Sequence, residues 1–189
     1  VWVIDPIDGT KSFISGSPLF GMLLAALKNG KPVAGIIRMP ALGECYGGAA
    51  QIGSDRDGIP LACRKDVPLD QAFLCINEAN GILANEPEVF ARLTKTGAYQ
   101  RFSYDCYPYA QLASGQVDAV VDVDLQPYDY LPVVPVVEGA GGCGHRLPLV
   151  GAVGARQHRH APAHLDEARG GTGPLDVAGH PVEVLGGTA

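Results

Sequence analysis

The sequence lacks the features that mark nucleic-acid-binding and membrane-spanning proteins. It contains no run of lysine or arginine, and its formal net charge of −6 argues against a nucleic-acid-binding surface. No apolar stretch approaches the roughly 20 residues that a helix needs to span a bilayer, and no signal peptide is visible. We therefore expect a cytoplasmic protein that acts on small molecules, with neither nucleic acid nor membrane as a partner.

The sequence also lacks closely paired cysteines. Its five cysteines are odd in number and widely spaced, and none forms a C-x-x-C pair. This pattern is typical of reduced thiols in a cytosolic protein, where most cysteines fill the core. Apolar residues make up 47% of the chain and charged residues 18%, which is ordinary for a globular domain with a sizeable core.

The apolar pattern predicts antiparallel strands together with intervening helices. Asn29-Gly30 stands between two apolar runs, and this pair predicts a hairpin that joins residues 19–27 to residues 32–39. We therefore predict a mixed α/β (α+β) fold in which sheets and helices form layers. Further strands are predicted at 1–4, 44–50, 72–76 and 117–123, and helices at 86–94, 107–113 and 128–139.

The opening stretch V-W-V-I-D-P-I-D-G-T carries the strongest chemical signal. We predict a turn over residues 5–9, with Thr10 as the cap of a short helical turn. Asp5 and Asp8 would repel each other if buried together, and a divalent cation removes that repulsion. Mg²⁺ suits the pair because it binds carboxylate oxygens and shares its other positions with water and substrate phosphate. A solvated turn in which one aspartate caps the next helix is the alternative interpretation of this spacing.

Three neighbours of the two aspartates could complete such a site. Ile7 offers a backbone carbonyl as a further oxygen ligand, and Gly9 allows a phosphate to approach the backbone closely. Thr10 adds a hydroxyl and a backbone N–H at the start of a helix, where anions bind. Metal ligands beside an anion-binding loop are what the hydrolysis of a phosphate ester requires.

Several motifs between residues 1 and 142 occur in a fixed order: W-V-I-D-P-I-D-G-T, P-A-L-G-E, D-G-I-P-L, R-F-S-Y-D-C-Y and L-Q-P-Y-D-Y. Together they resemble the inositol monophosphatase superfamily, and the later ones look most like its histidinol-phosphatase branch. The resemblance implies a layered αβαβα sandwich, here truncated at the N-terminus, and a Mg²⁺-dependent phosphomonoesterase. It favours L-histidinol phosphate as the substrate and L-histidinol as the product, with inositol-1-phosphate or a related sugar phosphate as the alternative.

The resemblance also assigns metal ligands. Asp5 would bridge two metal ions, and Ile7 would bind one of them through its carbonyl oxygen. Asp8 and Asp129 would hold the second ion. The expected cofactor is Mg²⁺, two or three ions per site, with inhibition by lithium. Read alone, Asp129 would be a simple acidic residue at the start of a helix.

Further residues would contact the substrate or take part in catalysis. Gly9 and Thr10 would contact the phosphate, together with Asp8 and Asp129, and Thr10 and Asp5 would act in catalysis. Arg101 would approach the substrate, although an exposed surface arginine is an equally good interpretation. Asp105 would either face an ammonium group of the substrate or cap the following helix, and we favour the cap.

Members of this family carry a metal-binding glutamate in a G-E-E-type segment before the aspartate motif. We expect such a segment upstream of Val1, so the chain as given should have little or no activity. A non-catalytic fragment that binds metal or phosphate is the alternative from another functional class. The resemblance also implies a homodimer when the protein is complete.

The composition changes after Gly142. Residues 143–189 contain all five histidines of the chain and no lysine, aromatic residue or isoleucine. We therefore predict a partial phosphatase domain over residues 1–142 and an atypical tail over 143–189, disordered or produced by a frameshift near Gly142. A zinc site at His158, His160 and His164 is the alternative, but it has no cysteine or acidic partner at the usual spacing.

Overall fold

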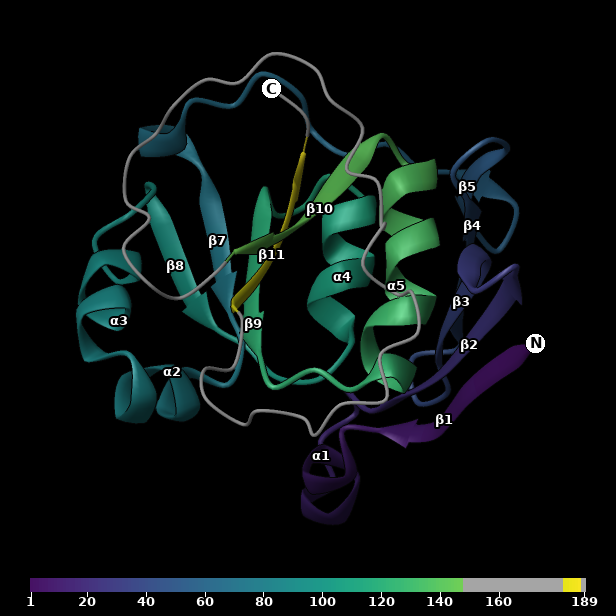
Figure 1. Ribbon diagram of the computed structural model, residues 1–189, viewed down its shortest axis with the longest axis horizontal. Coiled ribbons are helices and arrows are strands. Elements are labelled where there is room, and N and C mark those ends of the chain that lie inside the picture. The colour runs from purple at the N-terminus through teal and green to yellow at the C-terminus, as the bar shows by residue number, and fades with distance from the viewer. Residues whose placement is uncertain (148–181, 188–189) are drawn as a thin grey trace.

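The computed structural model describes residues 1–147 and 182–187, which form two sheets with helices between and beside them (Figure 1). In the first sheet every strand pairs antiparallel with the next strand of the chain. Asn29 and Gly30 have φ angles of 54° and 75°, as the predicted two-residue hairpin turn requires. The strands are β1 (Trp2–Asp8), β2 (Gly21–Lys28), β3 (Lys31–Met39), β4 (Glu44–Ala49), β5 (Gly53–Arg56) and β6 (Ile59–Pro60).

The second sheet has the strand order β10-β11-β9-β7-β8. Its strands β7, β8 and β9 run parallel, so their carboxyl ends meet at one edge, while β11 pairs antiparallel with β9 and β10. Residues that follow β7, β8 and β9 are therefore brought together although they are far apart in the sequence. The strands are β7 (Phe73–Ile76), β8 (Tyr99–Phe102), β9 (Ala119–Val123), β10 (Gly142–Leu147) and β11 (Val182–Gly187).

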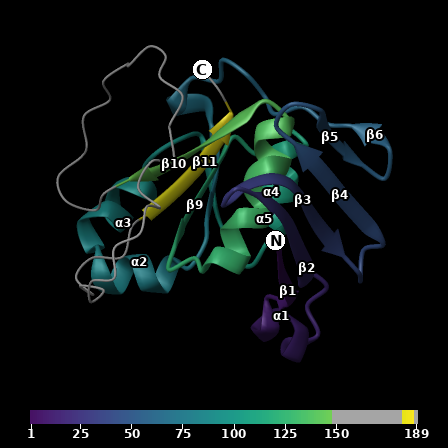
Figure 2. The same ribbon diagram turned by 45° about the vertical axis from the view of Figure 1, so that its right-hand side comes forward.

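The helices separate and cover the two sheets (Figures 1 and 2). Helices α4 and α5 lie between the sheets, and α2 and α3 cover the other face of the second sheet. These layers alternate sheet, helix, sheet, helix, in agreement with the predicted mixed α/β sandwich. The helices are α1 (Thr10–Ser15), α2 (Ala79–Asn85), α3 (Pro87–Leu93), α4 (Tyr107–Ala113) and α5 (Pro127–Gly139), with a 3-10 turn at Leu69–Gln71.

Helix α5 packs directly on the backbone of the first sheet. A Cβ atom at Gly35 would overlap the carbonyl oxygen of Pro132, and one at Gly48 would lie 2.5 Å from the Cα atom of Val136. Glycines in β3 and β4 therefore allow the close approach of the helix. Pro132 and Pro135 both lie inside α5, and each removes one backbone hydrogen bond of the helix.

Hydrophobic side chains from both sheets enclose this central helix layer. Leu23 and Ile37 of the first sheet and Val133 of α5 belong to the larger core cluster, and each is at most 1% exposed. A smaller cluster under α2 and α3 includes Ile76 and Ile82. On the far side of the first sheet, by contrast, Trp2 is 68% exposed and Ile4 57%.

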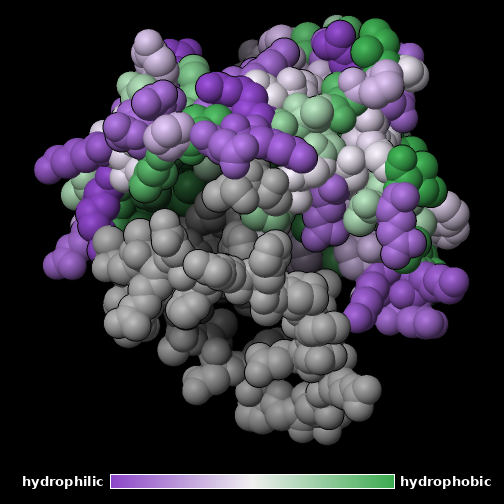
Figure 3. Space-filling view, turned by 90° about the horizontal axis from the view of Figure 1, so that it is seen from above, coloured by the Kyte–Doolittle hydropathy of each residue, from purple (hydrophilic) through white to green (hydrophobic). Residues whose placement is uncertain are grey.

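Polar and apolar side chains are mixed over the outer surface. Figure 3, a view from above, shows hydrophilic and hydrophobic residues interleaved on the described part of that face. None of the described helices is long and apolar enough to cross a membrane.

The structure corrects the sequence-based assignment at several points. The turn expected over residues 5–9 is wrong, because β1 continues as a strand to Asp8. The helix α2 and the strand β8 were not predicted. Two segments of the predicted atypical tail are strands, β10 and β11, while the boundary at residue 142 and the frameshift stay predictions. The alternative zinc site at residues 158–164 lies outside the described residues.

Candidate metal centre and cleft

A bulge in β1 places Asp5 and Asp8 on the same side of the strand. Asp5 pairs with Leu23 and Asp8 pairs with Gly21. Between these two pairs β1 advances by three residues and β2 by only two, so β1 contains one extra residue. In a regular strand, two residues three positions apart would point to opposite faces. The backbone N–H of Ile7 donates a hydrogen bond to Oδ1 of Asp5 at 3.0 Å, which fixes the carboxylate beside the bulge.

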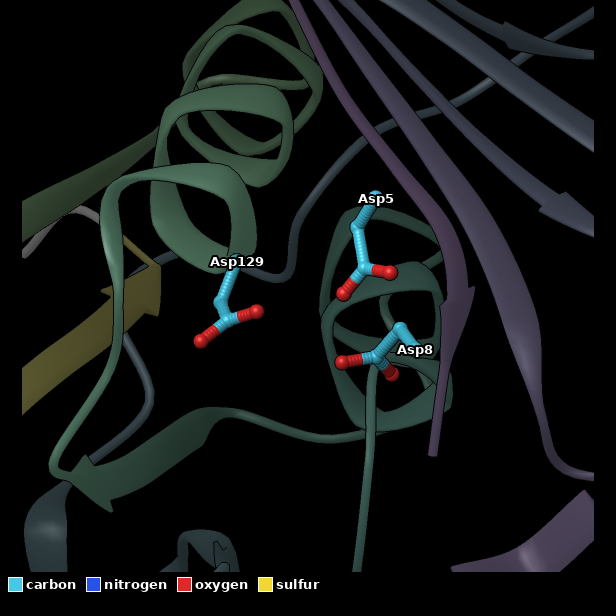
Figure 4. Close-up of side chains that lie close together, drawn as sticks. All are labelled: Asp5, Asp8 and Asp129. Atoms are coloured by element: carbon cyan, nitrogen blue, oxygen red, sulfur yellow. The ribbon is translucent and has the colours of Figure 1, made fainter. Parts of the chain in front are cut away.

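Asp129 joins these two residues from the start of α5. Asp5, Asp8 and Asp129 each offer a carboxylate oxygen, and these three atoms lie within 4.8 Å of one another. Figure 4 shows the carboxylates of the two strand residues on one side of a common space and that of Asp129 on the other. The structure therefore brings together three side chains that were predicted as metal ligands, and we call them the carboxylate trio.

Local structure holds Asp129 at this position. It is the third residue of α5 and forms a capping box with Gln126, whose backbone N–H donates to Oδ2 of Asp129 at 2.7 Å. Pro127 occupies the first turn, where its missing N–H does no harm. Asp129 is therefore an acidic residue that caps a helix start, as the simple interpretation holds, and it also belongs to the carboxylate trio.

Burial makes the trio unfavourable as bare charges. Desolvation, with smaller repulsion from Asp105, Asp129 and Asp5, raises the pKa of Asp8 to about 7. Burial also raises the pKa of Asp129, and the neighbouring Asp5 adds to this shift. A divalent cation would reverse the repulsion among the three groups.

The residues present fit a metal ion. Oδ2 of Asp8 is buried and has no hydrogen-bond partner within the described part of the chain, so this oxygen is available to a metal ion. All donors of the trio are carboxylate oxygens, the ligand type that Mg²⁺ prefers. The carbonyl oxygen of Ile7, a further predicted ligand, accepts a hydrogen bond from the hydroxyl of Thr10 at 3.3 Å.

The loop after β1 differs in detail from the prediction. Gly9 has φ 76° and is itself the N-cap of α1, so Thr10 is the first residue of the helix and not its cap. A Cβ atom at Gly9 would overlap the carboxyl group of Asp105, 2.8 Å from Oδ1. Only glycine therefore fits here, both for its positive φ and for this contact.

Asp105 does not cap the following helix. The N-cap of α4 is Cys106, and no side chain caps its backbone N–H groups. The carboxylate of Asp105 instead accepts a hydrogen bond from the hydroxyl of Ser12 and lies against Gly9. This residue therefore ties the segment after β8 to the loop that carries Gly9 and Thr10.

Two members of the trio open into a cleft of about 340 Å³, whereas Asp5 and Ile7 are not among its described lining residues. Of the predicted site residues, Asp8, Gly9, Thr10 and Asp129 line it. Arg101 is exposed on β8 and is not among the described lining residues, so the structure does not bring it to the cleft. Other lining residues are Lys11, Asn77, Glu78, Asp105, Cys106, Tyr109, Asp122 and Asp124.

A buried polar network under the cleft was missed by the sequence analysis. Asp122 accepts hydrogen bonds from the hydroxyl of Tyr109 at 2.7 Å and from Nδ2 of Asn77 at 2.8 Å. Burial raises the pKa of Asp122 to about 6, while these hydrogen bonds oppose the shift. The available signal was polar residues at the ends of two apolar strands, in F-L-C-I-N-E and V-V-D-V-D.

Comparisons with known proteins agree with this geometry. The sequence profile of the inositol monophosphatase family matches residues 1–158. The protein named "Bifunctional phosphatase IMPL2, chloroplastic" from Arabidopsis thaliana is 43% identical over 142 residues, which cover 75% of this chain and 41% of that protein. The "Histidinol-phosphatase" of Chlorobaculum parvum is 36% identical over 145 residues, covering 75% of this chain and 55% of that one.

Solved structures share the fold. An inositol monophosphatase from Zymomonas mobilis superposes with a TM-score of 0.67 at 33% identity, over 76% of this chain and 57% of that one. An inositol monophosphatase from Anabaena gives a TM-score of 0.73 over 98% and 66% of the two chains; at 24% identity it supports the fold alone. The chain spans about half the length of the curated relatives it matches. Since the family profile covers most of its residues, the chain belongs to the inositol monophosphatase family.

Proposed function

We propose that the protein containing these residues is a Mg²⁺-dependent phosphatase that hydrolyses a small phosphate monoester. The observation that carries this proposal is the carboxylate trio, with oxygens of Asp5, Asp8 and Asp129 within 4.8 Å of one another at the cleft. Bound divalent ions supply a Lewis acid that lowers the pKa of water and stabilises the oxygen of the leaving alcohol.

The remaining residues of the loop would hold the phosphate. Gly9 has no side chain to block the approach of a phosphate oxygen, and the hydroxyl of Thr10 can turn from the Ile7 carbonyl to donate to it. Lys11 lines the same cleft and offers a positive charge near the anion. Asp105 holds this loop through Ser12 and so keeps the two phosphate-binding residues in place.

We propose L-histidinol phosphate as the substrate and inositol-1-phosphate as the second candidate. Relatives with both names occur: histidinol-phosphatase in Chlorobaculum parvum at 36% identity and inositol-1-monophosphatase in Bacillus subtilis at 30%. The acidic lining of the cleft favours the substrate that carries a protonated amine. Inhibition by lithium, two or three Mg²⁺ ions, a homodimer and a cytoplasmic location belong to the same proposal.

The test is phosphate release by the whole protein that contains these residues, from the two substrates in parallel, with Mg²⁺ and with EDTA. We expect Mg²⁺-dependent release from L-histidinol phosphate in excess over inositol-1-phosphate, and its loss in the variant Asp5→Asn. The exposed Asp70→Asn is the matched control, because it changes the same functional group far from the cleft. Faster release from inositol-1-phosphate would reverse the order of the two substrates.

A non-catalytic fragment that binds metal or phosphate is the candidate from another class. The carboxylate trio supports it as well, because three clustered carboxylates can bind a cation without catalysis. Calorimetric titration with Mg²⁺ separates the two accounts. Binding that needs Asp5, without release of phosphate from either substrate, would support the fragment and contradict catalysis by this chain.

A further inference from the structure

Asn77 has a buried acceptor that no protein group satisfies. The residue follows β7, is 1% exposed and lines the cleft. Its Oδ1 atom has no hydrogen-bond partner among the described residues. An unpaired buried acceptor costs about 1–3 kcal/mol, so such an atom calls for an occupant that donates a hydrogen bond.

The hydrogen bonds of Asn77 fix which end of its amide is the free one. Nδ2 donates to the backbone carbonyl oxygen of Asp105 at 3.2 Å and to Oδ2 of Asp122 at 2.8 Å. Both partners are acceptors, so the NH₂ group must face them and the oxygen must face away. Asp122 is held in turn by Tyr109 and by the backbone N–H of Val123, which makes the arrangement rigid.

The surroundings of Asn77 favour a donor that is positively charged. Six carboxylate residues line the cleft, and only two of them, Asp8 and Asp129, belong to the carboxylate trio. The other four gather near the carboxyl ends of the parallel strands, where Asn77 also lies. These are Glu78, Asp105, Asp122 and Asp124. Metal ions at the trio would offset the charges of Asp8 and Asp129, and a cation beside Asn77 would meet the negative potential of this second group.

We propose that Oδ1 of Asn77 binds a protonated nitrogen of the substrate, an ammonium or imidazolium group, and so determines its specificity. The inference rests on the proposed function, which places the phosphate at Gly9 and Thr10 of the same cleft. A neutral hydroxyl would satisfy Oδ1 but would gain little from the negative potential around it, whereas a protonated nitrogen satisfies the acceptor and gains from that potential as well. The selected substrate is therefore a phosphate monoester of an alcohol that carries a basic nitrogen.

The test is direct binding of L-histidinol, which carries an ammonium and an imidazole but no phosphate, measured by calorimetry with Mg²⁺ present. Asn77→Leu and Asn77→Asp form a matched pair, because both lose the Nδ2 donors and only the aspartate keeps an acceptor. We expect the leucine variant to bind L-histidinol at least tenfold more weakly than the unaltered chain. The aspartate variant should stay within threefold.

Inorganic phosphate and myo-inositol serve as comparison probes. All three chains should bind inorganic phosphate with similar affinity, and myo-inositol, which offers only hydroxyl donors, should bind more weakly than L-histidinol. Equal loss of L-histidinol affinity in both variants would show that Asn77 acts only through Nδ2 and would overturn the proposal. Tighter binding of myo-inositol would overturn the assignment of a charged nitrogen.

The titration with L-histidinol and the phosphate-release assay together separate this proposal from the proposed function. Binding of L-histidinol that depends on the Asn77 acceptor, without any release of phosphate, would uphold the subsite and contradict the phosphatase activity. Release of phosphate from other monoesters, without binding of L-histidinol, would contradict the subsite and leave the phosphatase activity standing.

Discussion

Asp8 meets two conflicting demands in the metal-free protein. Its Oδ2 atom is buried and has no hydrogen-bond partner among the residues that the structure describes, and burial raises its pKa to about 7, so the ionised form is unfavourable there. The same isolation leaves its oxygen available to a cation. A side chain that binds a metal well is thus one that weakens the folded state when the metal is absent.

We predict that Asp8→Asn separates these two effects. The amide cannot carry the charge that a divalent cation requires, so Mg²⁺ affinity should fall at least tenfold. Without metal, the loss of a buried charge should raise the free energy of unfolding at pH 8 by up to about 4 kcal/mol, because burial raises the pKa of Asp8 to about 7. Calorimetric titration and urea denaturation in EDTA measure the two quantities. Unchanged Mg²⁺ affinity would exclude Asp8 as a ligand, and Asp70→Asn should change neither value.

The site residues differ in how visible they are in the sequence. Asp5 and Asp8 could be predicted because they stand in one short motif beside a glycine and a threonine. Asp129 lies far along the chain, and only the family resemblance pointed to it. Asn77 follows β7, and Asp122 lies near the end of β9. The two residues come together only because β7 and β9 run parallel. Single polar residues at strand ends carry no motif, so sequence reasoning could not pair them.

At the scale of elements, the position of Asp129 depends on how closely α5 packs on the first sheet. Gly35 faces Pro132 at a distance that leaves no room for a Cβ atom. Because Asp129 and Pro132 belong to the same helix, a change at this contact reaches the trio. The two sheet glycines at positions 35 and 48 therefore help to position Asp129 through α5, although neither contacts the carboxylate trio.

We predict that Gly35→Ala displaces α5 and weakens the metal centre. The added methyl group must move the helix backbone, which should cost about 1–3 kcal/mol of unfolding free energy or more. Mg²⁺ affinity should fall with it. Gly47→Ala is the control on β4, because its Cβ would meet nothing closer than Oδ2 of Asp55 at 3.9 Å. Urea denaturation and Mg²⁺ titration of both variants decide the matter: similar values would contradict a role for the close contact.

Local signals predicted some elements and not others. The Asn29-Gly30 hairpin was confirmed, because its turn chemistry is contained in two residues. The continuation of β1 was missed because a bulge, set by the pairing with β2, replaces the expected turn. The helix α2 reads A-N-G-I-L-A-N, a sequence of low helix propensity, and is held by burial of Ile82, which is 1% exposed. The strand β8 depends on parallel pairing with β7, which no local pattern reveals.

At the scale of the whole molecule, carboxylate groups are concentrated in one cleft. The chain carries a net charge of −6, and six carboxylate residues line one cleft. Burial raises the pKa of Asp8 to about 7 and that of Asp122 to about 6. Both groups hold their protons more tightly in the folded than in the unfolded chain. Their contribution to stability is therefore present at low pH and is lost as the pH rises.

This linkage predicts the pH dependence of the metal-free protein. Each raised carboxyl lowers the free energy of unfolding by up to about 1.4 kcal/mol per pH unit, from its unfolded-state pKa near 4 up to its folded-state value. For Asp122 the decline ends near pH 6, and for Asp8 it continues to about pH 7. A chain that lacks the Asp8 carboxyl should therefore escape the later part of the decline.

The measurement is urea denaturation of the unaltered chain and of Asp8→Asn in EDTA at pH 5, 6, 7 and 8. The stability advantage of the variant should grow from pH 5 to pH 7 and then level off, because above pH 7 Asp8 is ionised in both folded and unfolded states. The five histidines are common to both chains, so their contribution cancels in the difference. A difference that stays constant over this range would mean that Asp8 ionises freely in the folded protein, and that its burial does not prepare it for a cation.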